Sequence, residues 1–166
     1  MEGVVELNKE GDSVTVQHVL ALITKLKLIC NYDIVSGESC KLEYLLEKLD
    51  EISEQEEKAL VFSQYPEKTL RLLEPHLERF NTCIFDGSLS DSKRTQMVNK
   101  FQNESDIKVL LLSVRAGGLG ITLTRASHVY HFDLWWNPSV AAQAEDRAHR
   151  IGQKQPVFVT SLFTID

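Results

Sequence analysis

The chain has 166 residues, a length that suits one domain with a hydrophobic core. Its composition, 43% hydrophobic and 25% charged, is that of an average soluble globular protein. It has no apolar run of the roughly 20 residues that cross a bilayer and no apolar core of a secretory signal, so we expect no membrane partner. Three cysteines without CxxC spacing indicate reduced thiols and an intracellular protein, with neither a disulfide framework nor a metal site.

The net charge of −6 is unevenly distributed. Residues 1–106 carry 12 Lys and Arg against 20 Asp and Glu, whereas residues 107–166 carry 6 against 4. Charge distribution governs association and solubility, not the fold. We therefore expect any phosphate-binding surface to lie in the slightly basic C-terminal third.

Two helices, followed by alternating strands and helices, are predicted along the chain. Apolar residues at helical spacing predict helices at 14–30 and 40–54. The elements predicted after them are strands at 58–63, 82–85, 107–113, 127–134 and 156–163, and helices at 66–79, 91–101 and 138–150. Ser90 and Asn137 are expected to cap the last two helices, and Gly152 to end the final one.

This alternation predicts an α/β fold with a mostly parallel central sheet and helices on both faces. We divide the chain into N-terminal lead-in helices at 1–56, which pack on the lobe, and a lobe at 57–166 that functions as one domain. Because the chain ends directly after a predicted strand, we expect the domain to continue beyond Asp166.

A glycine-rich turn follows the strand at 107–113. Gly117, Gly118 and Gly120 allow strained backbone angles and a close approach to a ligand. A dinucleotide-binding GxGxxG turn is one interpretation, but position 123 is leucine and the next strand begins too soon for a crossover helix. A tight turn without a ligand is a further alternative.

The predicted helix at 138–150 places Gln143, Arg147 and Arg150 within an arc of roughly 60°. An apolar stripe beside them would face the sheet. Arginine offers forked, permanently charged donors that match phosphate oxygens. The alternative is a surface helix whose arginines pair with the acidic residues of the same segment.

Paired tryptophans precede that helix. We expect one of Trp135 and Trp136 in the core and the other exposed, where a tryptophan can contact bases or sugars. His128 and His131 point to opposite faces of a strand, which argues against a shared metal site. The sequence contains neither a GxxxxGK[ST] phosphate loop nor an acidic pair for Mg²⁺, so the chain alone cannot complete a nucleotide-hydrolysing site.

These segments resemble the motifs of one ATPase family. VLLLSVRAGGLGITLTRASHVYHFDLWWNPSVAAQAEDRAHRIGQ, at 109–153, resembles the fifth and sixth helicase motifs of Swi/Snf-type ATPases in helicase superfamily two. LVFSQY at 60–65 is similar to the fourth motif, FDGSLS at 85–90 to the DGS motif, and LKLICN at 26–31 to the helix leading into the second lobe. The resemblance covers residues 20–166, and DRAHRIGQ preceded by WNP is its most specific part.

The resemblance implies the RecA-like second lobe of an ATP-driven translocase of double-stranded DNA. ATP with Mg²⁺ would lie between two lobes, held mainly by the N-terminal one. By position in the motif, Arg147 and Arg150 would be catalytic arginines at the γ-phosphate, where such residues supply roughly 10³–10⁵ in rate. The implied ATP-binding residues are Gly118, Gly120, Gln143, Arg147 and Arg150. The isolated lobe is expected to be inactive.

The resemblance also implies a DNA groove, where backbone amides and short hydroxyls contact phosphates without reading sequence. Trp136 resembles the family's tryptophan near the minor groove. The implied DNA-binding residues are Ser63, Gln64, Gly87, Ser88, Ser113, Arg115, Ala116, Gly117 and Trp136. The implied partners are double-stranded DNA, the N-terminal RecA-like lobe of the same protein and DNA-bound proteins, in the cytoplasm or nucleoid of a microbe or the nucleus of a eukaryote.

Two alternative functions stay open. One is a lobe of another superfamily-two helicase, against which the WWNP and DRAHRIGQ segments argue. The other is a degenerate RecA-like module for protein interaction, against which the intact arginines and glycine turn argue.

Overall fold

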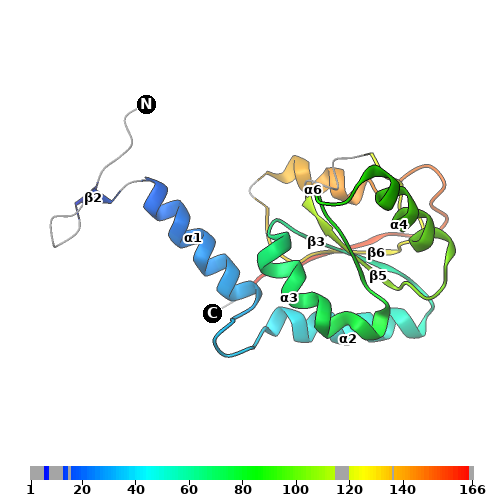
Figure 1. Ribbon diagram of the computed structural model, residues 1–166, viewed down its shortest axis with the longest axis horizontal. Coiled ribbons are helices and arrows are strands. Elements are labelled where there is room, and N and C mark those ends of the chain that lie inside the picture. The colour runs from blue at the N-terminus through cyan, green and yellow to red at the C-terminus, as the bar shows by residue number, and fades with distance from the viewer. Residues whose placement is uncertain (1–5, 8–12, 15, 115–119, 136, 165–166) are drawn as a thin grey trace.

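A computed structural model describes residues 6–7, 13–14, 16–114, 120–135 and 137–164. At its centre is a five-stranded parallel sheet in the order β4-β5-β3-β6-β7 (Figure 1). The strands are β3 (Ala59–Ser63), β4 (Cys83–Phe85), β5 (Val109–Ser113), β6 (His128–His131) and β7 (Phe158–Ser161), and a short antiparallel pair precedes them, β1 (Glu6–Leu7) with β2 (Ser13–Val14). The predicted α/β fold class is confirmed.

The inner strands are buried on both faces, as expected for a parallel sheet between two helical layers. Every residue of β3 and β5 is buried. Along β3, Ala59 and Val61 belong to one core cluster and Leu60 and Phe62 to the other, because successive side chains point to opposite faces. β7 forms one edge of the sheet, and its residues are mostly exposed.

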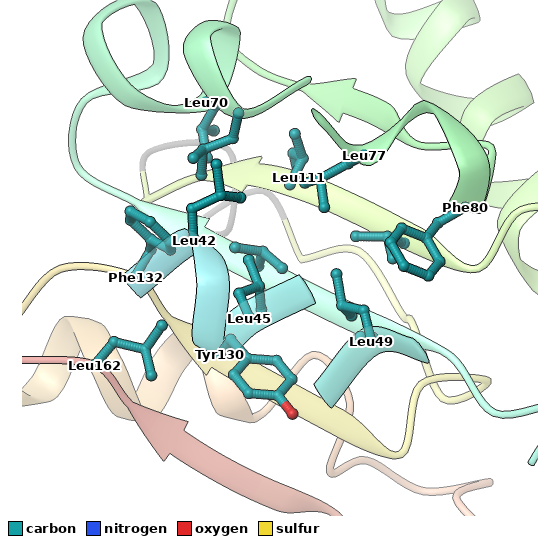
Figure 2. Packing of buried hydrophobic residues seen from close by; sticks show 14 of the residues in the cluster. Leu42, Leu45, Leu49, Leu70, Leu77, Phe80, Leu111, Tyr130, Phe132 and Leu162 are labelled. Atoms are coloured by element: carbon teal, nitrogen blue, oxygen red, sulfur yellow. The ribbon is translucent and has the colours of Figure 1, made fainter. Parts of the chain in front are cut away.

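One face is covered by α2 (Cys40–Glu54) and by the consecutive turns η1 (Pro66–Leu70), α3 (Arg71–Leu73) and η2 (Glu74–Phe80). Figure 2 shows their leucines and Phe80 meeting over Leu111 and Tyr130 of the sheet. The single helix expected at 66–79 is instead a π turn, a short α turn and a 3-10 helix. Pro75 lies in this segment and lacks the amide hydrogen that an unbroken helix requires.

The opposite face is covered by α4 (Asp91–Asn103) and α6 (Pro138–Glu145). Phe101 of α4 and Ala144 of α6 are buried against the sheet. Both predicted caps are confirmed, since the side chain of Ser90 accepts from the Lys93 amide and that of Asn137 from the Ser139 amide.

The prediction of a helix at 138–150 is wrong beyond Glu145, where α6 ends. The next amides bond three residues back: Arg147 N to Ala144 O at 3.1 Å and Ala148 N to Glu145 O at 3.0 Å. The chain therefore continues in tight turns, and Arg150 does not lie on a helical stripe with Gln143. Gly152 follows with a φ of 107°, a left-handed conformation that favours glycine.

The lead-in helix α1 (Val16–Asn31) extends away from the lobe (Figure 1). Most of its apolar side chains stay exposed, with Leu22 at 57%, Leu26 at 53% and Ile29 at 56%, whereas Asn31 at its end is fully buried. α1 thus meets the lobe mainly through its last turn. The domain division at residue 57 stays a prediction. Among the described residues, no helix is long and apolar enough to cross a bilayer.

Lys58 is buried directly before β3. Its ammonium donates to Phe101 O at 2.6 Å and to Glu104 O at the end of α4, and it lies 4.9 Å from the Phe101 ring. Burial, with the nearby charges of Arg125 and Lys108, lowers the pKa of Lys58 to about 8.

We expect this lysine to make stability rise with pH. Between about pH 8 and pH 10 the folded chain has released a proton that the unfolded chain still holds, so the free energy of unfolding increases by about 2 kcal/mol. Urea denaturation of wild type and Lys58→Met at several pH values measures the effect. An equal slope in the variant would show that the rise has another source.

Candidate functional site

The carboxyl ends of the parallel strands gather at one edge of the sheet, where ligands bind in open α/β folds. Most residues predicted to bind DNA lie at these ends. Ser63 and Gln64 end β3, Gly87 and Ser88 follow β4, and Ser113 ends β5. Outside the described residues lie Arg115, Ala116, Gly117, Gly118 and Trp136. The described members thus share one edge, and their contact with DNA stays a prediction.

Ser63 and Gln64 both bond to the carboxylate of Asp133, which follows β6. Ser63 is fully buried and its hydroxyl donates to Asp133 Oδ2. The Gln64 amide donates to Asp133 Oδ1 at 3.1 Å, and its side-chain Nε2 donates to the same oxygen at 3.0 Å. The hydroxyl and carboxamide donors expected to meet DNA are therefore turned toward an internal carboxylate.

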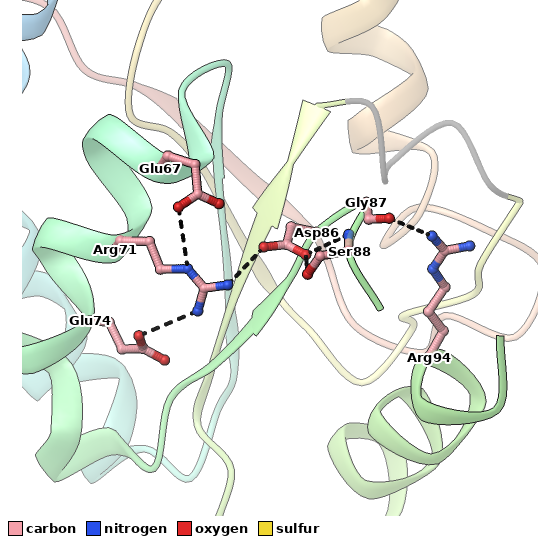
Figure 3. Close-up of polar contacts among 7 residues, drawn as sticks. All are labelled: Glu67, Arg71, Glu74, Asp86, Gly87, Ser88 and Arg94. Carbon is pink, nitrogen blue, oxygen red and sulfur yellow. Dashed lines mark hydrogen bonds and ion pairs between the residues drawn. The ribbon is translucent and has the colours of Figure 1, made fainter. Parts of the chain in front are cut away.

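Asp86 organises the turn that carries Gly87 and Ser88 (Figure 3). Its carboxylate accepts from Ser88 N at 2.9 Å and from Arg71 Nη2 at 3.0 Å. Burial alone would raise the pKa of Asp86, but the Ser88 hydrogen bonds and the Arg71 charge hold it below its usual value. From the other side, Arg94 donates to Gly87 O at 3.2 Å. The turn is thus fixed by a charged residue on each side.

Arg150 bonds to the end of the glycine turn. Its Nη1 donates to Gly120 O at 3.0 Å and to Thr122 Oγ1 at 3.1 Å. Gly120 has a φ of 69°, a conformation that glycine adopts without strain. Two predicted ATP-binding residues from separate segments are therefore in direct contact.

Gln143 belongs to α6, and Arg147 lies in the turns after it, where its carbonyl accepts from Leu123 N at 2.8 Å. Arg147 is half-buried, and its Nε is buried without a hydrogen-bond partner among the described residues. Within that part of the chain, no carboxylate lies at ion-pair distance from Arg147 or Arg150. Gln143 is exposed. The alternative of arginines paired with the acidic residues of their own segment is therefore not what the structure describes.

An aromatic cluster joins the end of β6 to α6. The His131 ring packs edge-on to Trp135, with centroids 4.9 Å apart, and Trp135 packs edge-on to Phe62 at 6.2 Å. His131 Nε2 lies 3.1 Å from Glu145 Oε1. Burial lowers the pKa of His131, although Glu145 acts in the opposite direction. The end of β6 therefore contacts both Trp135 and the last residue of α6.

Sequence reasoning did not identify Asp133 and Asp86 as organisers of this edge. Both are almost fully buried, with 1% and 3% of their surface exposed. For Asp86 the available signal was its place directly after a buried strand, because a buried carboxylate requires hydrogen-bond partners, whereas Asp133 lies within the strand predicted at 127–134 and gave no such signal. The partners themselves come from distant segments, and the spacing of residues does not show them.

The parallel sheet, the polar residues at the carboxyl ends of its strands and the contact of Arg150 with Gly120 are features of a RecA-like lobe. Residues 40–152 match the model of the helicase conserved C-terminal domain. The chain belongs to this family.

Curated relatives carry the same segment within much longer proteins. The chain is 40% identical over 161 residues to the putative ATP-dependent helicase/translocase YwqA of Bacillus subtilis, which covers 88% of this chain and 17% of the relative. It is 41% identical over 133 residues to the DNA repair protein rad8 of Schizosaccharomyces pombe, covering 78% of this chain and 12% of the relative. The chain thus spans less than a fifth of either protein.

Solved structures agree with this assignment. The C-terminal part of the Fun30 ATPase domain superposes with a TM-score of 0.73 at 38% identity, over 78% of this chain and 42% of that one. The Sulfolobus solfataricus SWI2/SNF2 ATPase core in complex with double-stranded DNA superposes with a TM-score of 0.74 at 32% identity, over 89% and 32%. The predicted resemblance to the C-terminal lobe of Swi/Snf-type ATPases is confirmed.

Proposed function

We propose that the chain is the second motor lobe of an ATP-dependent double-stranded-DNA translocase of the Swi/Snf type. The observation that carries the proposal is the state of the two arginines. Arg147 has a buried Nε without a partner in the described chain, and Arg150 is exposed beside the glycine turn. Buried donors are almost always hydrogen-bonded, so an unpaired one suits an incoming anion.

The nucleotide would be shared between two lobes. Arg147 and Arg150 would approach the γ-phosphate, with Gln143, Gly118 and Gly120 nearby, and would stabilise negative charge on the transferring phosphoryl group. The described residues contain no group of three His, Cys, Asp or Glu side chains able to hold a metal ion. Because the sequence has no GxxxxGK[ST] phosphate loop, we assign Mg²⁺ and most nucleotide contacts to the N-terminal lobe of the full-length protein.

DNA would lie along the carboxyl edge of the sheet. Gly87 and Ser88 lie in the turn that Asp86 holds, and this turn would place the chain beside the phosphates, which position the protein without reading sequence. Arg115, Ala116, Gly117, Ser113 and Trp136 would complete this surface. The Sulfolobus solfataricus ATPase core that superposes on the lobe was solved in complex with double-stranded DNA, which supports the same class of ligand.

The proposed ATPase cycle depends on both lobes contacting the same ATP phosphates. ATP would draw the lobes together because both contact its phosphates, and hydrolysis would remove that attraction. Alternating grip on one strand would move the lobes along the duplex inside the cell. DNA-bound proteins would be the targets, and one relative is named as a DNA repair protein.

We expect the full-length protein to hydrolyse ATP faster with duplex DNA than with single-stranded DNA or RNA. Steady-state phosphate release at saturating ATP, titrated with each nucleic acid, measures this. Equal stimulation by RNA would favour another superfamily-two helicase, and no turnover with any nucleic acid would favour a module for protein interaction.

A further inference from the structure

A buried polar network lies beneath the carboxyl edge. Five elements contribute one almost fully buried residue each, all below 9% exposure. These residues are Asn31 of α1, Lys41 of α2, Ser63 of β3, Thr69 of η1 and Asp133 after β6. Burying so many polar groups is costly unless each is hydrogen-bonded, so the arrangement of their partners is informative.

Asp133 is the acceptor at the centre of this network. Four donor atoms converge on its carboxylate: Ser63 Oγ, the Gln64 amide, Gln64 Nε2 and Asn31 Nδ2, the last at 3.3 Å. The remaining bond of Gln64 Nε2 goes to Leu134 O at 2.8 Å. The side-chain donors of Ser63 and Gln64 are therefore hydrogen-bonded within the protein.

Asn31 connects this carboxylate to a buried cation. Lys41 Nζ donates to Asn31 Oδ1 at 3.1 Å, while Asn31 Nδ2 donates to Asp133. Lys41 also donates to Phe132 O at 3.0 Å, directly before Asp133 in the chain. Burial lowers the pKa of Lys41, and the charge of Asp133 opposes that effect. The side chain of Asn31 therefore bridges the buried ammonium of Lys41 and the buried carboxylate of Asp133.

The network fixes the loop that leads from β6 to α6. Leu134 O accepts from Gln64 and also from Lys27 Nζ of α1 at 3.0 Å. Trp135, the next residue, packs against Phe62 at the end of β3. The last turn of α1 and the end of β3 therefore hold one short stretch of chain, which continues into α6 and the arginine segment.

We propose that Ser63 and Gln64 do not contact DNA phosphates but hold Asp133, and that Asp133 is a positioning residue that sets the β6–α6 loop through these donors and Asn31. The inference rests on the proposed motor function and changes the role of two residues at its edge. A DNA phosphate could bond to Ser63 and Gln64 only by displacing the Asp133 carboxylate, which already accepts from both side chains. Through Asn31, the last turn of α1 would then help to align the carboxyl edge of the sheet, where DNA would bind, with Arg147 and Arg150.

The test separates positioning from contact in the full-length protein. Gln64→Ala and Asn31→Leu are compared for the DNA dissociation constant and for the ATPase rate at saturating duplex DNA. Each variant loses one buried hydrogen bond to Asp133, and we expect this loss to lower the stimulated ATPase rate by about tenfold. The DNA dissociation constant is expected to stay within about twofold of wild type. Because both act through Asp133, the double variant is expected to be no slower than the slower single one.

Thr69→Val is the matched control, because it removes a buried hydroxyl that lies 3.1 Å from Asn31 Nδ2 without touching the bond to Asp133. Its stimulated rate is expected to stay near wild type. A tenfold weaker dissociation constant for Gln64→Ala, additive losses in the double variant, or equal rates for Asn31→Leu and Thr69→Val would each overturn the inference while leaving the motor function intact. A wild-type protein without DNA-stimulated hydrolysis would overturn both. Gln64 is only half-buried, so its variant keeps the test decisive if Asn31→Leu does not fold.

Discussion

Arg147→Ala is expected to abolish DNA-stimulated ATP hydrolysis in the full-length protein while leaving DNA affinity nearly unchanged. Arginines that stabilise charge on a transferring phosphoryl group contribute roughly 10³–10⁵ in rate. Arg147 carries a buried Nε that no described residue satisfies, and no described carboxylate neutralises its charge. Single-turnover hydrolysis with saturating duplex DNA measures the chemical step, and a filter-binding titration measures DNA affinity.

Arg125→Ala provides the matched control for Arg147→Ala. Arg125 is also an arginine, but it is exposed and lies before β6, at the opposite end of the sheet. Its variant is expected to hydrolyse ATP at the wild-type rate. An Arg147→Ala protein that loses about tenfold in DNA affinity, or about 1.4 kcal/mol, would reassign this arginine to the DNA groove.

The isolated chain is expected to show no steady-state ATPase activity, and fusion to its N-terminal lobe is expected to restore it. The sequence has no phosphate loop, so most of the nucleotide contacts must come from elsewhere. Phosphate release by the purified chain, by the partner lobe and by the fusion, each with and without duplex DNA, measures the contribution of each part.

A fusion carrying Arg147→Ala controls for activity that arises from the partner lobe alone, since that activity would survive the substitution. Turnover by the isolated chain that withstands repeated purification and persists in its own Arg147→Ala variant would indicate a contaminant. Turnover that disappears in this variant would show a complete active site within the chain and contradict the expectation.

The strands were predictable because each is a short apolar run between turn residues. β3 and β5 are buried on both faces, so their sequences are apolar almost without interruption. The caps were equally accessible, because Ser90 and Asn137 act within three residues of their own positions. Local patterns of this kind need no knowledge of distant neighbours.

The features that sequence reasoning missed are non-local. Asn31 and Asp133 are 102 residues apart in the chain and bond directly. Periodicity also could not show that α6 ends at Glu145, because tight turns preserve some of the spacing of a helix. Arg147 and Arg150 were singled out through the motif resemblance, independently of the helix, and their role at the γ-phosphate stays a prediction.

The strand order has a consequence for how the chain folds. β3 comes first among the sheet strands in sequence but lies in the middle, where Ala59 pairs with Val109 on one side and His128 on the other. Pairing strands this far apart in sequence requires closing long loops, which costs conformational entropy before the contacts stabilise the fold. We therefore expect the pairing of β3 with β5 and β6 to be slow. During synthesis, residues 59–63 would leave the ribosome long before their neighbours exist, and this apolar segment would need shielding from other nascent chains until the second half arrives.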